Sequence, residues 1–178
     1  MTIRSAAPAD SGAIAQLHAH SWQTAYRGIL RDDFLDGPLL ENRRALWASR
    51  LADANRADQF VLVDDHRGSL QGFACAFLDA DPEWGSLLDN LHVVPELKGK
   101  GLGRQLIAAV ADHVAVYGAC KRLHLWAYEQ NLGARRFYER LGGVVTLIHA
   151  EPALDGTQVN AVRYCWSELA ALAGHRRC

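Results

Sequence analysis

Apolar residues recur at two different spacings in the first half of the chain, and each spacing predicts its own kind of element. Between residues 10 and 26 they fall three or four positions apart, which predicts a helix after a candidate N-cap at Asp10. Residues 39–54, rich in Leu, Ala and Arg, predict a second helix. Short apolar runs bounded by polar turns predict strands over residues 2–6, 60–63 and 70–78.

The second half returns to strand spacing and then alternates strands with helices. The longest helical pattern begins at Leu102 and stops at Gly118, and a shorter one has Asn131 near its cap and Gly142 just past its end. The predicted elements are, in order, a strand over 87–94, a helix over 102–118, a strand over 123–128, a helix over 131–141 and an antiparallel pair over 144–149 and 159–166.

This order of elements predicts the fold class. Two helices come first, then a strand meander, then strands alternating with helices, and the length of 178 residues suits one domain with a proper core. We therefore expect a single α/β domain over residues 1–172, with a mixed sheet of about six to seven strands flanked by helices. Residues 173–178 are expected to be a frayed C-terminal tail.

Composition and charge exclude several classes of protein. The chain has 19 Lys and Arg against 20 Asp and Glu, and the resulting net charge of −1 argues against a large nucleic-acid footprint. No apolar run is long enough to span a bilayer, and the opening MTIRSAAPAD lacks the apolar core of a secretory signal. We expect a cytoplasmic protein with no nucleic-acid or membrane partner.

The cysteines and histidines carry no metal-binding pattern. The four cysteines are scattered without a CxxC, which predicts separate reduced thiols. The eight histidines include no HExxH, and His18 and His20 have the wrong spacing for one helix face. We expect no metal site.

The stretch LKGKGLGR, residues 97–104, has the features of a phosphate-binding loop. It follows a predicted strand and opens a predicted helix, whose first turn offers unpaired N–H donors and the positive end of the helix dipole. Its glycines allow close backbone approach and its basic residues add positive charge. The spacing fits neither GxxxxGK[ST] nor GxGxxG, which disfavours a nucleoside triphosphate or a nicotinamide cofactor. A glycine-rich turn with solvated lysines is the alternative.

A second stretch, NLGARRFYERLGG over residues 131–143, supports the ligand-binding interpretation. Asn131 and Tyr138 are seven apart on one helix face, with Ala134 and Arg135 between them. The strand before this helix runs parallel to the strand before the glycine loop if the crossover is right-handed. Two such strands that splay apart leave a cleft for an elongated ligand. Taken alone, a tyrosine such as Tyr138 is more often a core aromatic residue.

Together, LHVVPELKGKGLGRQLI (residues 91–107) and NLGARRFYERLGG resemble the GNAT acetyltransferase superfamily. The family pattern Q/R-x-x-G-x-G/A falls on residues 98–103, and N-x-x-A-x-x-F-Y-E-x-x-G falls on residues 131–142 in full. The resemblance extends over nearly the whole chain. It implies the GNAT fold, with an acyl-CoA cleft between splayed parallel strands, and acetyl-CoA or a related acyl-CoA as co-substrate.

The resemblance also implies roles for individual residues. Backbone amides of the glycine loop would hold the pyrophosphate, and Val93 and Val94 would hydrogen-bond the pantetheine arm. Val93 N–H would also face the thioester oxygen, and Tyr138 would protonate the leaving thiolate. The implied cofactor-binding residues are Val93, Val94, Lys98, Gly99, Lys100, Gly101, Leu102, Gly103, Arg104, Asn131 and Arg135.

The chain departs from the family pattern at two positions of chemical interest. Lys98 stands where Gln or Arg is usual, which keeps a donor but loses the guanidinium fork. Leu87 stands about where many members have a glutamate base. The attacking amine must lose a proton, and the candidates to take it, directly or through water, are Asp89, His92 and Glu129.

The acceptor is expected on the opposite side of the sheet, between the first helices and the strands. Trp22 and Tyr26 are the candidate acceptor-binding residues, with Phe34 and the acidic loop over residues 79–84 nearby. Aromatic rings beside acidic groups suit a cationic amine. Core aromatics and a solvated acidic turn are the alternative.

These features predict an acetyl-CoA-dependent N-acetyltransferase that acts on a primary amine of a small molecule or peptide by direct attack. A non-catalytic acyl-CoA-binding sensor or interaction module on the same fold is the alternative. Tyr138 favours catalysis, because binding requires no acid beside the sulfur, whereas the missing glutamate at position 87 slightly favours the module. The closing strands, residues 144–166, are a candidate homodimer interface.

Overall fold

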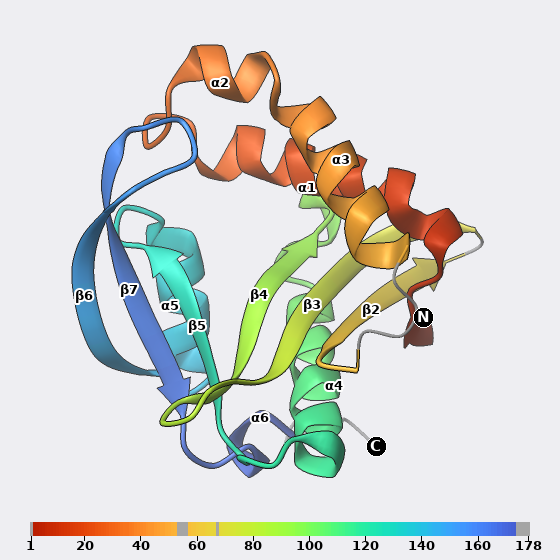
Figure 1. Ribbon diagram of the computed structural model, residues 1–178, viewed down its shortest axis with the longest axis vertical. Helices are drawn as coiled ribbons and strands as arrows, with labels where there is room; N and C mark the ends of the chain where they lie inside the picture. The colour runs from red at the N-terminus through yellow and green to blue at the C-terminus, as the bar shows by residue number, and fades with distance from the viewer. Residues whose placement is uncertain (1, 53–56, 67, 174–178) are drawn as a thin grey trace.

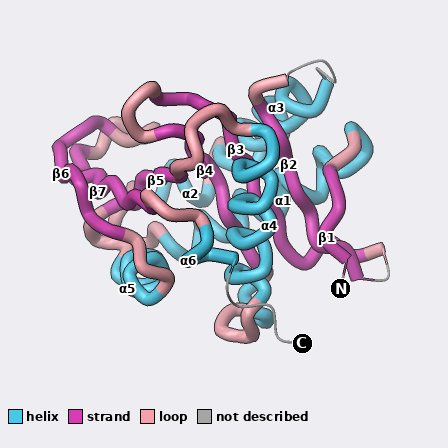
Figure 2. The backbone as a smooth tube through the Cα atoms, turned by 90° about the horizontal axis from the view of Figure 1, so that it is seen from below, coloured by secondary structure: helices cyan, strands magenta, loops and turns pink. Residues whose placement is uncertain are grey.

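The computed structural model describes residues 2–52, 57–66 and 68–173. Within them the seven strands form one sheet in the order β1-β2-β3-β4-β5-β7-β6, with β6 and β1 at opposite edges (Figure 2). Neighbouring strands are antiparallel except for the parallel pair β4 and β5. The strands are β1 (Thr2–Ser5), β2 (Gln59–His66), β3 (Ser69–Asp81), β4 (Gly85–Val93), β5 (Leu123–Tyr128), β6 (Val144–Pro152) and β7 (Gln158–Trp166).

The helices connect and cover this sheet (Figure 1). Two of them, α2 and α6, and two 3-10 turns are too short to show a periodic pattern and were not predicted from sequence. The helices and turns are η1 (Pro8–Asp10), α1 (Ser11–Ala25), α2 (Asp32–Asp36), α3 (Leu39–Ala52), η2 (Pro95–Leu97), α4 (Leu102–Tyr117), α5 (Leu132–Arg140) and α6 (Ala170–Ala173). The fold class predicted from the sequence is confirmed.

Several boundaries differ from the sequence prediction by a few residues. The first helix begins at Ser11, because residues 8–10 form the 3-10 turn η1. The β2–β3 hairpin is longer than the apolar runs indicate, since polar residues at its turn still pair as strand, as in His66 opposite Ser69. Residues 53–54 of the second predicted helix and residues 174–178 of the predicted tail lie outside the described residues.

The two faces of the sheet bury alternate residues of the same strands. Val61, Val63 and Phe73 pack on one face against Ile14 of α1 and Trp47 of α3. Leu62, Ala74 and Ala76 pack on the other face against α4, which contributes Leu102, Leu106, Ile107, Val110 and Val114. Strand alternation therefore separates the two helical layers, with α1 and α3 on one side of the sheet and α4 on the other.

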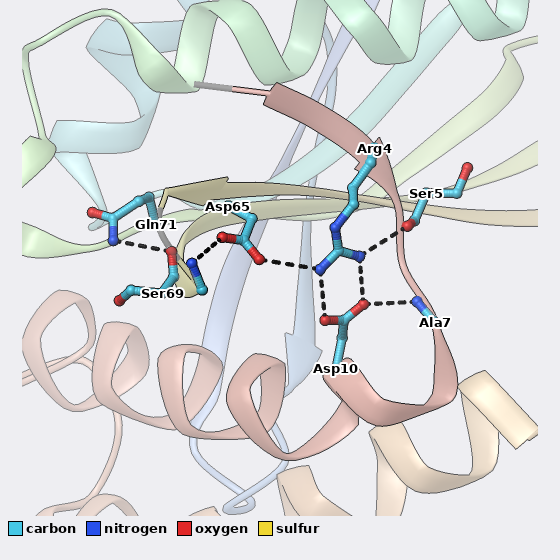
Figure 3. A network of polar contacts seen from close by, with 8 residues as sticks. Arg4, Ser5, Ala7, Asp10, Asp65, Ser69 and Gln71 are labelled. Atoms are coloured by element: carbon cyan, nitrogen blue, oxygen red, sulfur yellow. Dashed lines mark hydrogen bonds and ion pairs between the residues drawn. The ribbon is translucent and has the colours of Figure 1, made fainter.

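A polar cluster fixes the N-terminal strand to its neighbours (Figure 3). The guanidinium of Arg4 in β1 donates two hydrogen bonds to Asp10, at 2.7 and 2.9 Å, and one to Asp65 of β2 at 3.3 Å. Asp10 also accepts from the backbone N–H of Ala7 at 2.7 Å. The cluster joins the edge strand to the start of α1 and to β2.

The parallel strands β4 and β5 touch only at one end. Their paired residues are Ser86 with Leu123 and Leu87 with His124, and beyond these the strands diverge (Figure 1). Gly85 permits the close approach at this end, because a Cβ there would lie 2.6 Å from the Arg122 carbonyl oxygen. The splay predicted from the sequence is present and opens a gap in the middle of the sheet.

Candidate active site

A cleft of about 1810 Å³ lies between the diverging strands and the helices that follow them. The glycine loop and the N-terminal turn of α4 form one wall, and α5 forms another. Of the residues predicted to bind the cofactor, the cleft is lined by Val93, Lys98, Gly99, Lys100, Gly101, Gly103, Arg104 and Asn131, and Tyr138 also lines it. The structure therefore brings the two sequence motifs, about thirty residues apart in the chain, to one cavity.

The start of α4 offers free backbone donors to this cleft. The first helical bond runs from Gln105 N–H to the Gly101 carbonyl at 3.1 Å, so the N–H groups of Leu102, Gly103 and Arg104 precede it and lack a helical acceptor. Gly101 is the N-cap, has a φ of 91° and provides no capping side chain. A helix start of this kind is suited to bind the anionic oxygens of a phosphate.

The backbone of β4 presents donors on the side that faces the gap. Val94 N–H is bonded to the Gln71 carbonyl of β3 at 2.9 Å, and Val93 is paired with Gly72. Backbone groups of consecutive strand residues point to opposite sides, so the N–H of Val93 points away from β3 and into the gap. Val93 thus has the donor expected of it, whereas the N–H of Val94 is already taken by β3.

Tyr138 on α5 extends into the cleft from among other aromatic rings. Its ring centroid lies 5.3 Å from that of Phe137, 5.8 Å from Tyr164 and 6.2 Å from Trp166. Burial raises the pKa of the Tyr138 hydroxyl above its usual value. The hydroxyl therefore stays protonated at neutral pH and can act as a proton donor.

The other two residues predicted on α5 differ in their placement. Asn131 caps the helix, since its side-chain oxygen accepts from Ala134 N–H at 3.2 Å, and it lines the cleft. Arg135 does not line the cleft. Its guanidinium donates to the Tyr164 hydroxyl at 3.0 Å and pairs with Glu139 at 3.7 Å, which directs it toward β7.

His92 lines the cleft beside a second histidine. Its ring lies 4.6 Å from the ring of His18, whose Nδ1 accepts from the Trp47 indole N–H at 3.0 Å. Burial, with minor contributions from Lys98 and Arg43, lowers the pKa of His92 to about 3, and burial lowers the pKa of His18 further. Both imidazoles are therefore neutral at physiological pH, and His92 is a weak base.

Asp89 occupies an irregular position in β4. Cys75 of β3 pairs with Asn90 and Ala76 pairs with Leu88, so Asp89 is the extra residue of a β-bulge. Arg50 of α3 donates to the Asp89 carboxylate at 2.6 Å and to the Asn90 side-chain oxygen at 2.9 Å. The bulge and the ion pair hold this carboxylate at the gap.

Glu129, the third candidate base, lines neither cavity and accepts from Asn160 at 2.7 Å.

A second, smaller pocket of about 350 Å³ lies on the α1 and α3 side of the gap. Both predicted acceptor residues, Trp22 and Tyr26, line it, and their rings are 5.0 Å apart. Six residues line both cavities and mark where they meet: Trp22, Tyr26, Asp89, Asn90, Trp126 and Ala127. The two cavities are therefore neighbours across the splayed strands.

The acidic loop predicted near the acceptor is elsewhere. Asp79 accepts from Ala119 N–H and Cys120 N–H, both at 2.8 Å, at the end of α4, and Asp81 accepts from Glu83 N–H and Trp84 N–H in its own turn. This loop is at the end of the sheet where β4 and β5 pair (Figure 1), and none of residues 79–84 lines the pocket. Phe34 lies in α2, packs partly buried against the neighbouring apolar cluster and does not line the pocket.

Several lining residues of the smaller pocket were not predicted from the sequence. Arg43 and Arg50 are the most informative, because they are cations on a helix face that otherwise packs against the core. Arg43 lies four residues after Leu39 and four before Trp47, both fully buried, and that spacing was the available signal. The other polar and aromatic lining residues that were missed are Asn90, Trp126, Tyr128 and Glu151.

Residues 2–52, 57–66 and 68–173 hold no group of three His, Cys, Asp or Glu side chains arranged for a metal ion. No helix within them is long and apolar enough to cross a bilayer.

Comparison with known proteins agrees with the geometry of the cleft. The sequence profile described as "Acetyltransferase (GNAT) family" matches residues 18–143, which include both motifs. The chain belongs to this family. A solved relative with the same fold is the PaiA N-acetyltransferase from Thermoplasma acidophilum in complex with coenzyme A, with a TM-score of 0.71 and 18% identity over 91% of this chain and 96% of that chain.

Two named GNAT relatives differ in their acceptors. The Escherichia coli (strain K12) L-amino acid N-acyltransferase MnaT is 32% identical over 82% of this chain and 81% of its own length. The Bacillus subtilis (strain 168) spermine/spermidine N(1)-acetyltransferase is 37% identical over 43% of this chain. That match spans about half, 54%, of the relative's length.

Proposed function

We propose that the protein is an acetyl-CoA-dependent N-acetyltransferase that acetylates the primary amine of a small molecule. The observation that carries this proposal is the meeting of two cavities at the β4–β5 gap, one with free amides at a helix start and one lined by aromatic and charged side chains. Such an arrangement allows a thioester on one side to be attacked by an amine from the other. The relatives named for spermine, spermidine and L-amino acids agree with an amine acceptor.

The larger cleft would bind acetyl-CoA. The residues present fit the group, because the free N–H donors at the start of α4 match its pyrophosphate, and Lys98 and Lys100 add positive charge beside them. The gap-facing backbone of β4 would pair with the pantetheine arm as an added strand would. Asn131 lines the same cleft, whereas we assign Arg135 the role of holding α5 against β7.

The transfer would be a direct displacement. The amine nitrogen forms a bond to the thioester carbonyl carbon, and the Val93 N–H stabilises the negative oxygen of the tetrahedral intermediate, an effect of about 3–4 kcal/mol for one such donor. The C–S bond then breaks, and the leaving thiolate receives a proton from the Tyr138 hydroxyl. The products are the N-acetylated amine and coenzyme A.

We propose that Asp89 accepts the proton of the attacking amine, directly or through a water molecule. Asp89 lines both cavities, whereas His92 lines only the larger cleft. His92 is also the weaker candidate because burial lowers its pKa to about 3. Arg50 orients the carboxylate through the 2.6 Å ion pair.

The first experiment is thiol release from acetyl-CoA with a panel of amino acids, polyamines, aminoglycosides and short peptides. We expect saturable release with one class of amine, a large loss in Asp89→Asn, and a smaller loss in His92→Gln. If His92→Gln is the more damaged variant, the base is His92. If acetyl-CoA binds but no amine reacts, the non-catalytic module is the better account.

The exposed edge of the sheet supports a proposal on assembly. Strand β6 has one unpaired edge, and the side chains of Val144, Val145, Leu147 and Ile148 are between 41% and 62% exposed. Edge strands with exposed apolar residues are prone to pair with another chain, so we propose a homodimer through β6. Light scattering of the wild type and of Leu147→Lys tests it, and a monomeric wild type would contradict it.

Two expectations on the chain as a whole remain proposals. We propose that residues 1–172 act as one catalytic domain, and limited proteolysis should leave this unit intact. We propose a cytoplasmic location, in which the thiols of Cys75, Cys120 and Cys165 stay reduced. Cell fractionation checks the location.

A further inference from the structure

The smaller pocket is walled by five elements of the fold and has the size of a small acceptor. Its volume is about 350 Å³, and residues of the β6–β7 hairpin, Glu151, Leu154 and Ala161, line it together with residues of α1, α3, β4 and β5. A volume of this size matches a small molecule. Its charged side chains therefore decide which small amines can enter.

Three of the four charged groups in this pocket already have partners. Arg50 and Asp89 form the 2.6 Å ion pair, and Arg50 also donates to Asn90. Glu151 lies 3.0 Å from the Nε2 of His149. The ion pair with Arg50 occupies the Asp89 carboxylate, and two arginines against two carboxylates give the pocket no excess of negative charge for a polycationic acceptor.

Arg43 is the exception. Its side chain is only 6% exposed, yet it forms no ion pair with any carboxylate of the described residues. Its contacts are with the Asn42 side-chain oxygen, which accepts from Nε at 3.2 Å and also from Nη2, and with the Trp22 ring, whose centroid is 4.7 Å from the guanidinium carbon. Neither contact supplies a negative charge, and the Asp89 carboxylate, whose charge also acts on Arg43, is already paired with Arg50 at 2.6 Å.

A buried cation without a counter-ion is costly, and the cost is reduced when a ligand brings an anion. The desolvation is visible in Arg43, whose pKa burial lowers from its usual value. A guanidinium matches a carboxylate well, because two parallel N–H groups can bind its two oxygens. The stack on Trp22 fixes the plane in which this fork lies.

We propose that Arg43 binds the carboxylate of the acceptor, so that the acceptor is a small amino carboxylate such as an α-amino acid. This inference rests on the proposed function and names the substrate class of the same site. With the carboxylate at Arg43, the amine on the adjacent carbon would face the gap, where Asp89 and Asn90 line both cavities. The acceptor side chain would lie among Trp126, Tyr128 and Leu154.

The test compares matched acceptors and matched variants. Each of several L-amino acids is assayed for acetylation beside its methyl ester, its amide and its decarboxylated amine. The variants are Arg43→Gln, Arg43→Lys and the control Arg44→Gln. Arg44 is the next residue on α3, half exposed and paired only with Glu41, so its loss changes the net charge equally without touching the pocket.

We expect wild type to favour the free acids. Arg43→Gln should raise their KM about 10- to 100-fold, with a smaller change in kcat, and leave the poor turnover of the esters and amines unchanged. Arg43→Lys should fall between, because it keeps the charge and loses the fork. Arg44→Gln should match wild type.

Two other results would overturn the inference, and they differ in what they imply. If esters, amides or polyamines react with wild type as well as the acids do, the carboxylate is not recognised. The proposed N-acetyltransferase activity would still stand. If no acceptor of any class reacts while acetyl-CoA binds, the proposed function fails as well. The wild-type comparison decides even if Arg43→Gln does not fold.

Discussion

The two cavities that meet at the β4–β5 gap are built in different ways. The larger cleft uses backbone N–H groups at the start of α4, on a loop and helix that are contiguous in the chain. The smaller pocket uses side chains from α1, α3, β4, β5 and the β6–β7 hairpin, which lie far apart in the sequence. A site built from backbone tolerates change in most side chains but not in the conformation of its glycines, whereas a site built from side chains can change its ligand through one substitution.

The largest expected effect is at the junction of the two cavities. Tyr138→Phe removes the proposed proton donor while keeping the ring among Phe137, Tyr164 and Trp166. We expect kcat to fall about 10²- to 10⁴-fold, since that is the usual contribution of a general acid. Thiol release gives kcat, and calorimetry should show an unchanged Kd for coenzyme A. An unchanged kcat would exclude Tyr138 as the acid.

The next largest effect tests whether the cleft binds its ligand through the backbone, because the substitution changes backbone conformation and removes no functional side chain. Gly101→Val places a β-branched residue at a φ of 91°, which shifts the free amides of α4. We expect the Kd of coenzyme A to rise about 10-fold or more. Gly68→Val has comparable strain, at a φ of 78°, in the β2–β3 turn, which does not line the cleft. Equal Kd values for the two variants would contradict the backbone-based site.

The histidines beside the cleft predict a pH dependence of stability. The pKa values of His18 and His92 are lowered by burial, that of His92 to about 3, so between pH 6.5 and about 3 the unfolded chain binds more protons than the folded chain. Stability is therefore greatest above pH 6.5 and falls as the pH drops, by at most ~1.4 kcal/mol per pH unit for each histidine.

Urea unfolding of wild type and His92→Gln at several pH values measures this dependence. The variant should have the shallower slope, because one of the two groups is gone. Identical slopes would mean that His92 is accessible to protons in the folded protein.

The smallest expected effect concerns a side chain of the cleft. Lys98 is exposed in the glycine loop, where a family pattern more often has Gln or Arg. Lys98→Gln should raise the KM for acetyl-CoA only about two- to five-fold, and less at high salt, because exposed charges near a helix start contribute little. Lys121→Gln, beyond the other end of α4, makes the same change of charge and should have no effect. If Lys98→Gln weakened the binding of acetyl-CoA more than Gly101→Val does, the cleft would depend on its side chains more than on its backbone.

The sequence predicted the cleft far better than the pocket. Two short motifs hold the residues of the cleft, namely Gly99, Gly101, Gly103 and Tyr138. Each motif is local in sequence, so the start of one helix and one face of the other could be predicted from spacing alone. The exception is Arg135, which the same spacing placed beside Asn131 but which bonds to Tyr164 on a neighbouring strand. Whether Arg135 faces the cleft or Tyr164 depends on how α5 packs on the sheet.

The pocket depends on tertiary structure that the sequence pattern does not reveal. The bulge that sets Asp89 arises from the pairing of β3 with β4, and the ion pair with Arg50 joins residues 39 positions apart. The acidic loop was expected near the acceptor, yet it lies at the end of the sheet where β4 and β5 pair. Trp22 and Tyr26 were predicted from the place that the family resemblance gives to the acceptor, and both line the pocket.

The most direct test of a divided site is a kinetic comparison of Gly101→Val, Arg43→Gln and the double variant, with KM measured for acetyl-CoA and for an α-amino acid acceptor. We predict that Gly101→Val raises only the first KM, that Arg43→Gln raises only the second, and that the double variant shows both increases independently. If either variant raises both constants to a similar extent, the two cavities do not bind the two substrates separately, and the account is wrong.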